Sequence, residues 1–557
     1  MTKTIWRKLD RRIETIWADT PEYCAGQEKN GTWKERLGKY CRAHRTELLF
    51  VLLMGCFLCG LSWILPFDQG PDEKMRYMIP TYIYRHGTLP AGYDPEVTSR
   101  IWGISYAYQP ILPYIFGGYL MKLVGLFTTG DKALLMAARF INVLIGMGFY
   151  WYVLQISKKL FHRGIFRVFF VALLAMLPQL LYLFVYVNTD GIAMLSSAML
   201  ICYWLEGLEH HWDRRSCTRL AVGVSVCALS YFNAYGYALF SIVLFVVSLA
   251  VRYMKRGLKA CMQIILKRGI YITVLVFLLA GWWFIQCAIL YDGDFLGMKV
   301  QDHYAEMYAQ EDFKPSVKKS LYQQGVPLAQ MLANEEEGGM EWIRTTWRSF
   351  IGYFGYYKYA LGLDIYEIHK RLSALGAVGL FLKILVHCLE YAMGSLIPLL
   401  KKMGIWKQEK AGISGRKSVK WYAAAGTVGE KMHPMEFFVL QFSFVCCIII
   451  PVLLSLYYSY MSDFQPQGRY IMPMVIPLMY FVTVGIERFV TLFFGKWMQY
   501  VMMVPLFYAV LHVFLGAFIS VYIPTYYEPL ASWADIRFVW FSNLRVFTRL
   551  IQMLFPG

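Results

Sequence analysis

Long apolar segments separated by short polar turns make up most of the chain. Each approaches the roughly 18 to 20 apolar residues that a helix needs to cross a bilayer. A shorter apolar segment, 110–127, begins with Pro110 and Pro113 and contains Gly117-Gly118, so we expect it to be an interfacial or re-entrant helix. The pattern predicts an all-α polytopic membrane protein with about eleven transmembrane helices. These are expected near 47–66, 134–157, 166–187, 190–208, 218–233, 235–253, 270–290, 372–400, 436–458, 470–487 and 498–521.

Composition and charge support this prediction. The sequence is 57% hydrophobic and 17% aromatic, well outside the range of ordinary soluble domains. Its net charge of +18 is not gathered in one domain. Basic residues instead occupy the N-terminal arm and the loops at Lys158-Lys159, Arg214-Arg215, 252–268 and 401–431. That distribution follows the positive-inside rule and attraction to membrane lipids, so no nucleic-acid partner is expected.

The same charge pattern predicts a topology. A basic N-terminal arm favours a cytoplasmic N-terminus, which places two long polar segments outside the membrane. Amphipathic, aromatic-rich helices in those segments should lie in the interface plane and roof a cavity. We therefore expect a multi-pass protein of the cell membrane with an extracytoplasmic active site. Its expected regions are a cytoplasmic arm 1–46, a membrane module 47–290 with first exterior loop 67–133, an exterior loop 291–370, membrane helices 371–521 and an exterior tail 522–557.

Two adjacent carboxylates, Asp72 and Glu73, follow the first apolar segment directly. An ionisable group held near hydrocarbon is costly, which makes it a functional hypothesis by default. Neighbouring carboxylates are expected to raise each other's pKa, which suits a general base. The alternative is a solvated start of the loop. Lys74 and Arg76 follow closely, and Arg76 is expected to pair with Glu73 or to bind a substrate phosphate.

Two further polar groups start later apolar segments. Asn188-Thr189-Asp190 fits either a helix N-cap or a carboxylate facing Asp72 across a cavity, where the two would share a divalent cation or a cationic substrate group. Arg469, in Gly468-Arg469-Tyr470, is nearly the only basic residue of its loop. A guanidinium there suits bidentate binding of a lipid phosphate, and snorkelling to headgroups is the alternative.

Other signals are weaker. Arg139 lies in an apolar context and is interpreted as a charge at a helix end. The segment 345–355 could line an acceptor groove, although an aromatic belt explains it more simply. The sequence contains no Walker loop, no His-Glu-x-x-His and no Gly-x-Ser-x-Gly, so nucleotide hydrolysis, zinc-dependent proteolysis and serine hydrolysis have no support.

Taken together, these motifs resemble those of the GT-C class of membrane glycosyltransferases, in particular the protein-mannosyltransferase and lipid A aminoarabinose-transferase superfamily with its related uncharacterised bacterial branch. The resemblance covers roughly 45–490 in order. It is carried by Pro71-Asp72-Glu73-Lys74-Met75-Arg76-Tyr77, Asn188-Thr189-Asp190, Ser349-Phe350-Ile351-Gly352 and Gly468-Arg469-Tyr470-Ile471-Met472-Pro473.

The resemblance implies a sugar donor linked to polyprenyl phosphate and used on the extracytoplasmic side, with a glycan, lipid or protein as acceptor. It implies that Asp72 deprotonates the acceptor, which attacks with inversion, and that Glu73 supports or orients it. Such enzymes need no nucleotide sugar, no cofactor is assigned, and a divalent cation between Asp72 and Asp190 is left open. The expected substrate-binding residues are Arg76, Lys74, Asp190, Asn188, Arg469 and Tyr470. The alternative function is a transporter or flippase of a lipid-linked glycan.

Overall fold

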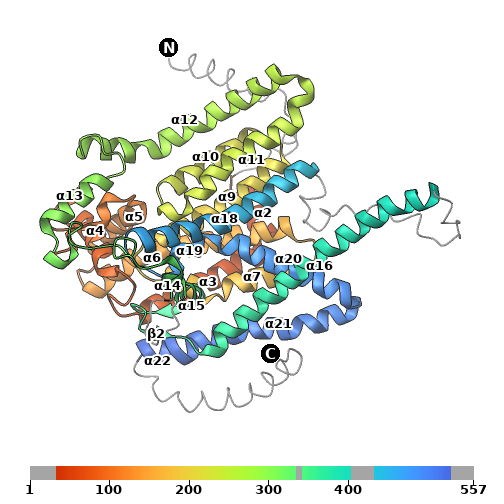
Figure 1. Cartoon of the computed structure of the whole chain (residues 1–557). Coiled ribbons are helices and arrows are strands. Elements are labelled where there is room, and N and C mark those ends of the chain that lie inside the picture. The colour runs from red at the N-terminus through yellow and green to blue at the C-terminus, as the bar shows by residue number, and fades with distance from the viewer. Residues whose placement is uncertain (1–32, 334–340, 403–431, 528–557) are drawn as a thin grey trace.

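The computed structural model of this 557-residue chain describes residues 33–333, 341–402 and 432–527. Helices account for nearly all of its regular structure, and one short antiparallel sheet pairs β1 (Tyr353–Phe354) with β2 (Tyr359–Ala360). The helices form an elongated bundle (Figure 1). Residues 1–32 of the expected basic arm and residues 528–557 of the expected tail lie outside the described residues.

Eight helical segments of the described residues are long and apolar enough to cross a membrane. The predicted all-α polytopic membrane protein is therefore confirmed. The segments are built on α3 (Arg45–Ile64), α6 (Asp131–Leu160), α9 (Asp190–Glu209), α11 (Tyr235–Tyr253), α12 (Leu258–Leu290), α18 (Pro434–Met461), α20 (Val475–Phe493) and α21 (Lys496–Ala517).

The remaining helices are shorter, or lie partly outside the residues whose side chains are described. They are α2 (Trp33–Ala43), α4 (Glu73–His86), α5 (Leu112–Gly125), α7 (Gly164–Ala175), α8 (Pro178–Leu183), α10 (Arg214–Ala228), α13 (Met298–Tyr308), α14 (Leu328–Leu332), α15 (Trp342–Ile351), α16 (Leu363–Lys402), α19 (Gly468–Ile471) and α22 (Ile523–Tyr526). Single 3₁₀ turns include Tyr106–Tyr108.

Three of the expected spans differ from the eight segments. The expected span 166–187 is interrupted, because α7 ends at Ala175 and α8 begins at Pro178. Proline lacks an amide hydrogen and pushes the residue before it out of the helical region, and Leu177 accordingly has ψ 113°. The expected span 218–233 becomes the 15-residue α10, and 372–400 falls within α16. The short segment 110–127 forms the 14-residue α5 and is not among the candidate spans.

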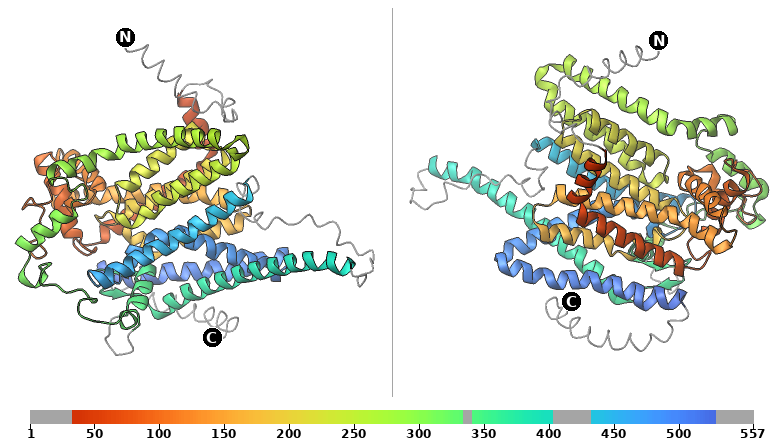
Figure 2. Two further views of the ribbon diagram at one scale, coloured as in Figure 1. Left: turned by 45° about the horizontal axis from the view of Figure 1, so that its top comes forward. Right: turned by 180° about the vertical axis from the view of Figure 1, so that it is seen from behind.

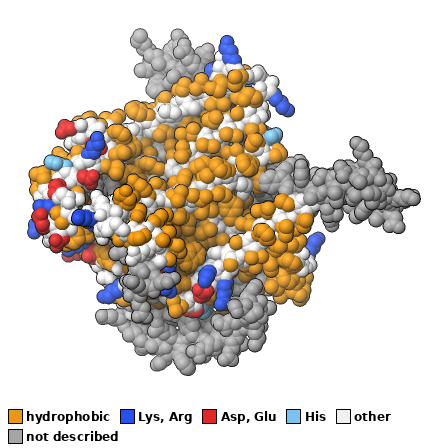
Figure 3. All heavy atoms as spheres, viewed as in Figure 1, with side chains coloured by type: hydrophobic (Ala, Val, Ile, Leu, Met, Phe, Trp, Pro, Cys, Tyr) orange, Lys and Arg blue, Asp and Glu red, His pale blue; other side chains and the backbone are white. Residues whose placement is uncertain are grey.

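Polar contacts distinguish the two ends of the bundle. At one end, which we call the basic end, Lys158 bonds Glu47, and the basic residues of neighbouring turns also find partners there. These contacts are Lys159–Glu209 at 2.6 Å, Arg163–Gln499 at 2.6 Å and Arg252–Glu436 at 2.5 Å. The other end, which we call the loop end, comprises segments 65–130, 291–333, 341–362 and 462–467, with α4, α5, α13 and α15 gathered there (Figures 1 and 2). Hydrophobic side chains cover much of the visible flank between the two ends, as Figure 3 shows.

This separation matches the charge pattern from which the topology was predicted. The expected exterior segments share one end, and the basic turns described in the structure lie at the other. Which end faces the cytoplasm stays a prediction from the positive-inside rule.

Two helices of the C-terminal half cross unusually closely. Gly376 and Gly379 on α16 face Gly485 on α20, and a Cβ atom on Gly485 would collide with the carbonyl oxygen of Gly376. A Cβ on Gly379 would likewise collide with the carbonyl of Gly485. Small residues at such a crossing let the backbones approach, which is a common source of helix association in membranes.

We expect Gly485→Ala to lower the stability of the bundle by about 1–3 kcal/mol, because the added methyl group forces the two backbones apart. Thermal unfolding of the protein in detergent measures this loss. Gly60→Ala on α3 is the matched control, since a Cβ there meets nothing within 4 Å, and the helix gains slightly from alanine. Equal melting temperatures for the two variants would contradict the account of the crossing.

Candidate active site

The turn before α4 sends the adjacent carboxylates of Asp72 and Glu73 to different partners. Gly70 lies against the ring of Tyr186, where a Cβ atom would collide with the ring, and its carbonyl accepts the Glu73 amide hydrogen at 3.1 Å. Asp72 is the N-cap of α4 with φ 62°, in the left-handed region that residues with a side chain rarely adopt. Strain of this kind often marks a functional position.

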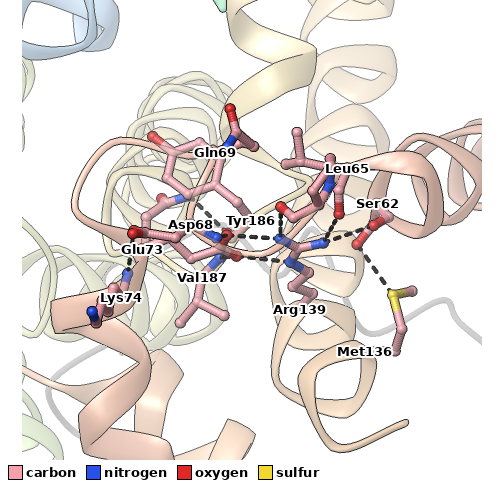
Figure 4. A network of polar contacts seen from close by, with 12 residues as sticks. Ser62, Leu65, Asp68, Gln69, Glu73, Lys74, Met136, Arg139, Tyr186 and Val187 are labelled. Carbon is pink, nitrogen blue, oxygen red and sulfur yellow. Dashed lines mark hydrogen bonds and ion pairs between the residues drawn. The ribbon is translucent and has the colours of Figure 1, made fainter. Parts of the chain in front are cut away.

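Glu73 is clamped inside the protein by Arg139. The Arg139 guanidinium donates from Nε and Nη2 to the two carboxylate oxygens, both at 2.7 Å, and the side chains are 0% and 1% exposed. Arg139 also donates to three carbonyls at the C-terminal end of α3, where the helix dipole favours a cation. Two of those carbonyls belong to Ser62 and Leu65 (Figure 4). The third belongs to Pro66. The clamp fixes the start of α4 to α3 and α6.

Asp72 is paired with two arginines. Arg469 Nη2 donates to its carboxylate at 2.8 Å, and Arg76 Nη2 lies 3.9 Å from the same oxygen. Arg76 is almost fully buried, and its Nη1 donates to Asp190 at 3.0 Å. Its guanidinium also lies 4.6 Å from the ring centroid of Tyr106. Arg76 therefore bridges Asp72 and Asp190, rather than pairing with Glu73 as one sequence-based alternative proposed.

These charges set the acidity of Asp72. Burial alone would raise the pKa of its carboxyl group, but the Arg469 and Arg76 guanidiniums outweigh burial and lower the pKa to about 2. The sequence-based expectation that Asp72 and Glu73 raise each other's pKa is wrong for Asp72. The physical reason is that Glu73 is neutralised by Arg139, while Asp72 faces two cations.

Arg469 is positioned by a close contact between two distant segments. The amide of Gly468 donates to Ser349 Oγ at 2.7 Å, and a Cβ atom on Gly468 would collide with the backbone of Phe350. Glycine is therefore required for α19 to approach α15. Two motifs that carry the sequence resemblance thus touch each other, and the contact fixes the residue next to Gly468.

A cavity of about 480 Å³ opens beside these residues at the loop end. Its walls come from the loop before α5, from α13 and the segment after it, from the end of α18 and from α19. Asp72, Arg469 and Tyr470 all line it. Within the described part of the chain, Arg469 Nε and Nη1 are buried and have no hydrogen-bond partner. An arginine with two unsatisfied donors at a cavity wall is suited to bind an anion.

The other expected site residues do not line this cavity. Lys74 is exposed, and Asp190 is buried against Arg76. Asn188 is buried and donates to the carbonyls of Leu183 and Tyr186 at 2.8 and 2.9 Å, while its oxygen accepts the Gly191 amide at 2.9 Å. Asn188 therefore satisfies backbone groups at the start of α9, as the capping alternative predicts.

The arrangement does not fit a cation shared by Asp72 and Asp190. The Arg76 guanidinium lies between the two carboxylates, at 3.9 and 3.0 Å from them. Across residues 33–333, 341–402 and 432–527, no group of three or more His, Cys, Asp or Glu side chains could hold a metal ion. A hard divalent cation prefers six or more oxygen ligands, so no step is assigned to one here.

Sequence reasoning missed two residues of this region. Arg139 was interpreted as a charge at a helix end, although its place in an apolar segment is the usual signal of a buried ion pair. Tyr106, which lines the cavity and lies over Arg76, carries no sequence signal, because only the fold brings its loop to α4. Burial raises the pKa of Tyr106, which keeps its hydroxyl group neutral.

Comparison with solved structures gives a remote likeness, whereas comparison by sequence gives none. No family model and no curated protein matches the chain. The structure of the archaeal oligosaccharyltransferase AglB from Archaeoglobus fulgidus, in complex with an inhibitory peptide and a dolichol-phosphate, is similar with 10% sequence identity and a TM-score of 0.43. The match covers 87% of this chain and 55% of that one, so this chain spans about half of its length. A likeness this remote assigns no family, and function must be argued from the site.

We expect Arg139→Ala to lower stability by about 3–5 kcal/mol, because it leaves the Glu73 carboxylate buried without a partner. The double variant Glu73→Gln with Arg139→Gln should lose less, since no lone charge remains. Arg344→Ala is the control: its guanidinium pairs with Glu341 at the surface and is 62% exposed, so the expected loss is below about 1 kcal/mol. Thermal unfolding of the purified protein tests this, and an Arg139→Ala variant as stable as the control would contradict the clamp.

Proposed function

We propose that this protein is an integral membrane glycosyltransferase of the GT-C type, which moves a sugar from a polyprenyl-phosphate donor to an acceptor hydroxyl at the loop end of the bundle. The observation that carries the proposal is the pairing of Asp72 with Arg469 at the wall of a polar cavity. The Asp72 carboxylate can accept a proton, and the Arg469 guanidinium has two N–H groups available for a phosphate.

Arg469 would hold the donor phosphate. Its Nε and Nη1 atoms have no partner among the described residues, and each can donate a charge-assisted hydrogen bond to a phosphate oxygen. Negative charge grows on the phosphate as the glycosidic bond breaks. A fixed guanidinium at that position therefore stabilises the transition state more than the ground state.

Asp72 would act as the general base. In the proposed step the acceptor oxygen attacks the anomeric carbon of the sugar from the face opposite the phosphate. A bond forms between that oxygen and carbon, and the bond from the carbon to the phosphate oxygen breaks. The proton of the acceptor hydroxyl passes to Asp72, and the bonding electrons leave with the polyprenyl phosphate. The product carries an inverted anomeric centre.

The low pKa of Asp72 makes it a weak base until a donor binds. Arg469 and Arg76 are the cause of that low value. A phosphate bound to Arg469 brings a negative charge that offsets one of these cations, so the pKa of Asp72 should rise in the donor complex. A base that strengthens only beside its donor is well matched to its task.

The residues behind Asp72 act by positioning it. Arg76 holds the Asp72 carboxylate in place from the side of Asp190, and Glu73 fixes the turn through Arg139. Neither Arg76 nor Glu73 lines the cavity, so both belong to the support of the site rather than to its reacting surface. From the charge pattern, we infer that the loop end faces away from the cytoplasm.

We expect Asp72→Asn to reduce sugar transfer by at least about 100-fold, because the base is lost while the amide keeps the shape and its oxygen can still accept the Arg469 hydrogen bond. Release of polyprenyl phosphate from a panel of lipid-linked sugars, by protein in nanodiscs, measures transfer. Asp312→Asn, an exposed carboxylate outside the cavity, is the control.

Release of polyprenyl phosphate by Asp72→Asn at the rate of the unmodified protein would show that Asp72 is not the general base.

A flippase would behave differently. It would move labelled donor across sealed vesicles without releasing polyprenyl phosphate, and Asp72→Asn would leave that movement intact.

We expect Arg469→Gln to raise the KM for the lipid donor by at least about tenfold, since a charge-assisted hydrogen bond to the phosphate is lost. A second readout is the pH profile. The Arg469 cation lowers the pKa of Asp72, so its removal raises that pKa, and the carboxylate is then lost at a higher pH as the solution is acidified. The acid limb of kcat/KM should therefore move to higher pH. Arg344→Gln is the control, and an unchanged donor KM with an unchanged acid limb would contradict the phosphate role.

A further inference from the structure

A continuous series of polar contacts runs along the cavity wall from Arg469, the partner of Asp72. Arg469 Nη2 donates to the Tyr470 hydroxyl at 3.1 Å, and that hydroxyl donates to the Gln465 side-chain oxygen at 2.5 Å. The Gln465 amide donates to Asp463 at 2.7 Å, and Asp463 pairs with Lys318 at 2.8 Å. All five residues line the cavity.

This series of contacts ends at two aromatic rings, Trp102 and Phe313, which we call the platform. The Lys318 ammonium lies 5.3 Å from the ring centroid of Trp102, and Trp102 packs against Phe313 with 4.3 Å between ring centroids. Both rings line the cavity, and Trp102 remains 37% exposed. A partly exposed tryptophan ring that another aromatic ring contacts offers apolar surface to a ligand.

The loop that carries Trp102 is held in place. Gly103 has φ 63°, and a Cβ atom there would crowd the backbone of Ala309. The Gln310 amide donates to the carbonyl of Ile101 at 3.0 Å. These contacts join the Trp102 loop to the end of α13, so the platform is formed before a ligand arrives. Preorganisation of this kind reduces the entropy lost on binding.

The same cavity is also lined by side-chain amides. Two of them have buried carbonyl oxygens, Gln109 Oε1 and Gln467 Oε1, that lack a partner in the described part of the chain. An amide both donates and accepts, as does a sugar hydroxyl group. The amides that line the cavity belong to Gln109, Gln301, Gln323, Gln465 and Gln467.

The charges of the cavity disfavour an anionic acceptor. Its two cations are both paired with carboxylates, Arg469 with Asp72 and Lys318 with Asp463, and a further carboxylate, Asp302, lines the same space. The donor phosphate would use the free donors of Arg469. A second anion near Trp102 would find carboxylates and amides rather than an available cation.

We propose that the end of the cavity at Trp102 is an acceptor subsite for a neutral saccharide, which stacks on Trp102, is held by the glutamine amides and presents one hydroxyl to Asp72. The inference rests on the proposed function and deepens it by naming the acceptor class. The reaction forms and breaks the same bonds as the transfer step proposed above, and the attacking hydroxyl group belongs to the acceptor sugar. The products are a glycan longer by one sugar and free polyprenyl phosphate.

The first test measures acceptor kinetics with a lipid-linked sugar that the unmodified protein turns over, using neutral oligosaccharides, their phosphorylated counterparts and peptides containing Ser and Thr. We expect transfer to the neutral oligosaccharides. Trp102→Ala should raise the acceptor KM about tenfold, with little change in donor KM, because one stacking contact is lost. Trp102→Phe should keep the acceptor KM close to that of the unmodified protein. Transfer to peptides alone, or preference for phosphorylated saccharides, would overturn the inference while leaving the glycosyltransferase proposal intact.

The second test does not depend on catalysis. Saturation-transfer NMR of neutral oligosaccharides of hexoses and N-acetylhexosamines should show contact with the detergent-solubilised protein, and Trp102→Ala should remove at least half of the signal. Trp63→Ala is the matched control: it also lies under a lysine, with Lys132 Nζ 3.8 Å from its ring centroid, but it lines a different cavity. Equal signals from the two variants, or no signal from the unmodified protein, would overturn the saccharide subsite. Failure of donor turnover in every assay would instead count against the proposed function.

Discussion

The buried ion pair between Glu73 and Arg139 is the interaction on which the rest of the site depends. It joins the start of α4 to the last carbonyls of α3 and to the interior of α6, so the first loop cannot shift relative to the bundle. A carboxylate and a guanidinium that are both withdrawn from water need near-complete hydrogen bonding to be tolerated. Here the pair has it: two bonds join the partners, and further bonds reach backbone groups. Because this clamp is rigid, the neighbouring Asp72 can be held in a left-handed conformation and aimed at Arg469.

The two adjacent carboxylates therefore have different roles. Glu73 is fully neutralised and structural, whereas Asp72 remains 28% exposed at the cavity and shares its charge with Arg469 and Arg76. Such a carboxylate keeps its negative charge over the whole ordinary pH range, since its pKa is about 2. It gains basicity only when another anion competes for Arg469. In the proposed mechanism that anion is the donor phosphate, so donor binding and activation of the base are the same electrostatic event.

The sequence predicted the fold class and several parts of the site for identifiable reasons. The length of an apolar segment indicates directly whether its helix can cross a membrane, so the polytopic bundle and the short α5 were predictable. The break at Leu177-Pro178 was not predicted, because hydropathy does not depend on the missing amide hydrogen of a proline. The resemblance, rather than the chemistry of either residue alone, implied that Asp72 and Arg469 serve one site. In the structure Arg469 Nη2 lies 2.8 Å from the Asp72 carboxylate, although 397 positions separate the two residues. The partners of Glu73 and Arg76 were not predictable, because each depends on which long-range neighbour the packing supplies. The platform at Trp102 depends in the same way on the loop contacts of Gly103 and was likewise invisible in the sequence.

The central claim is that Arg469 binds the phosphate of a lipid carrier beside Asp72. An electron cryo-microscopy structure of the protein in nanodiscs loaded with polyprenyl phosphate tests it most directly. The account predicts phosphate density at the cavity wall, with an oxygen about 3 Å from Arg469 Nε or Nη1 and the lipid chain leaving toward the membrane. Phosphate bound elsewhere, for example beside Lys132 or at the basic end of the bundle, with Arg469 still bonded only to Asp72 and Tyr470, would contradict it.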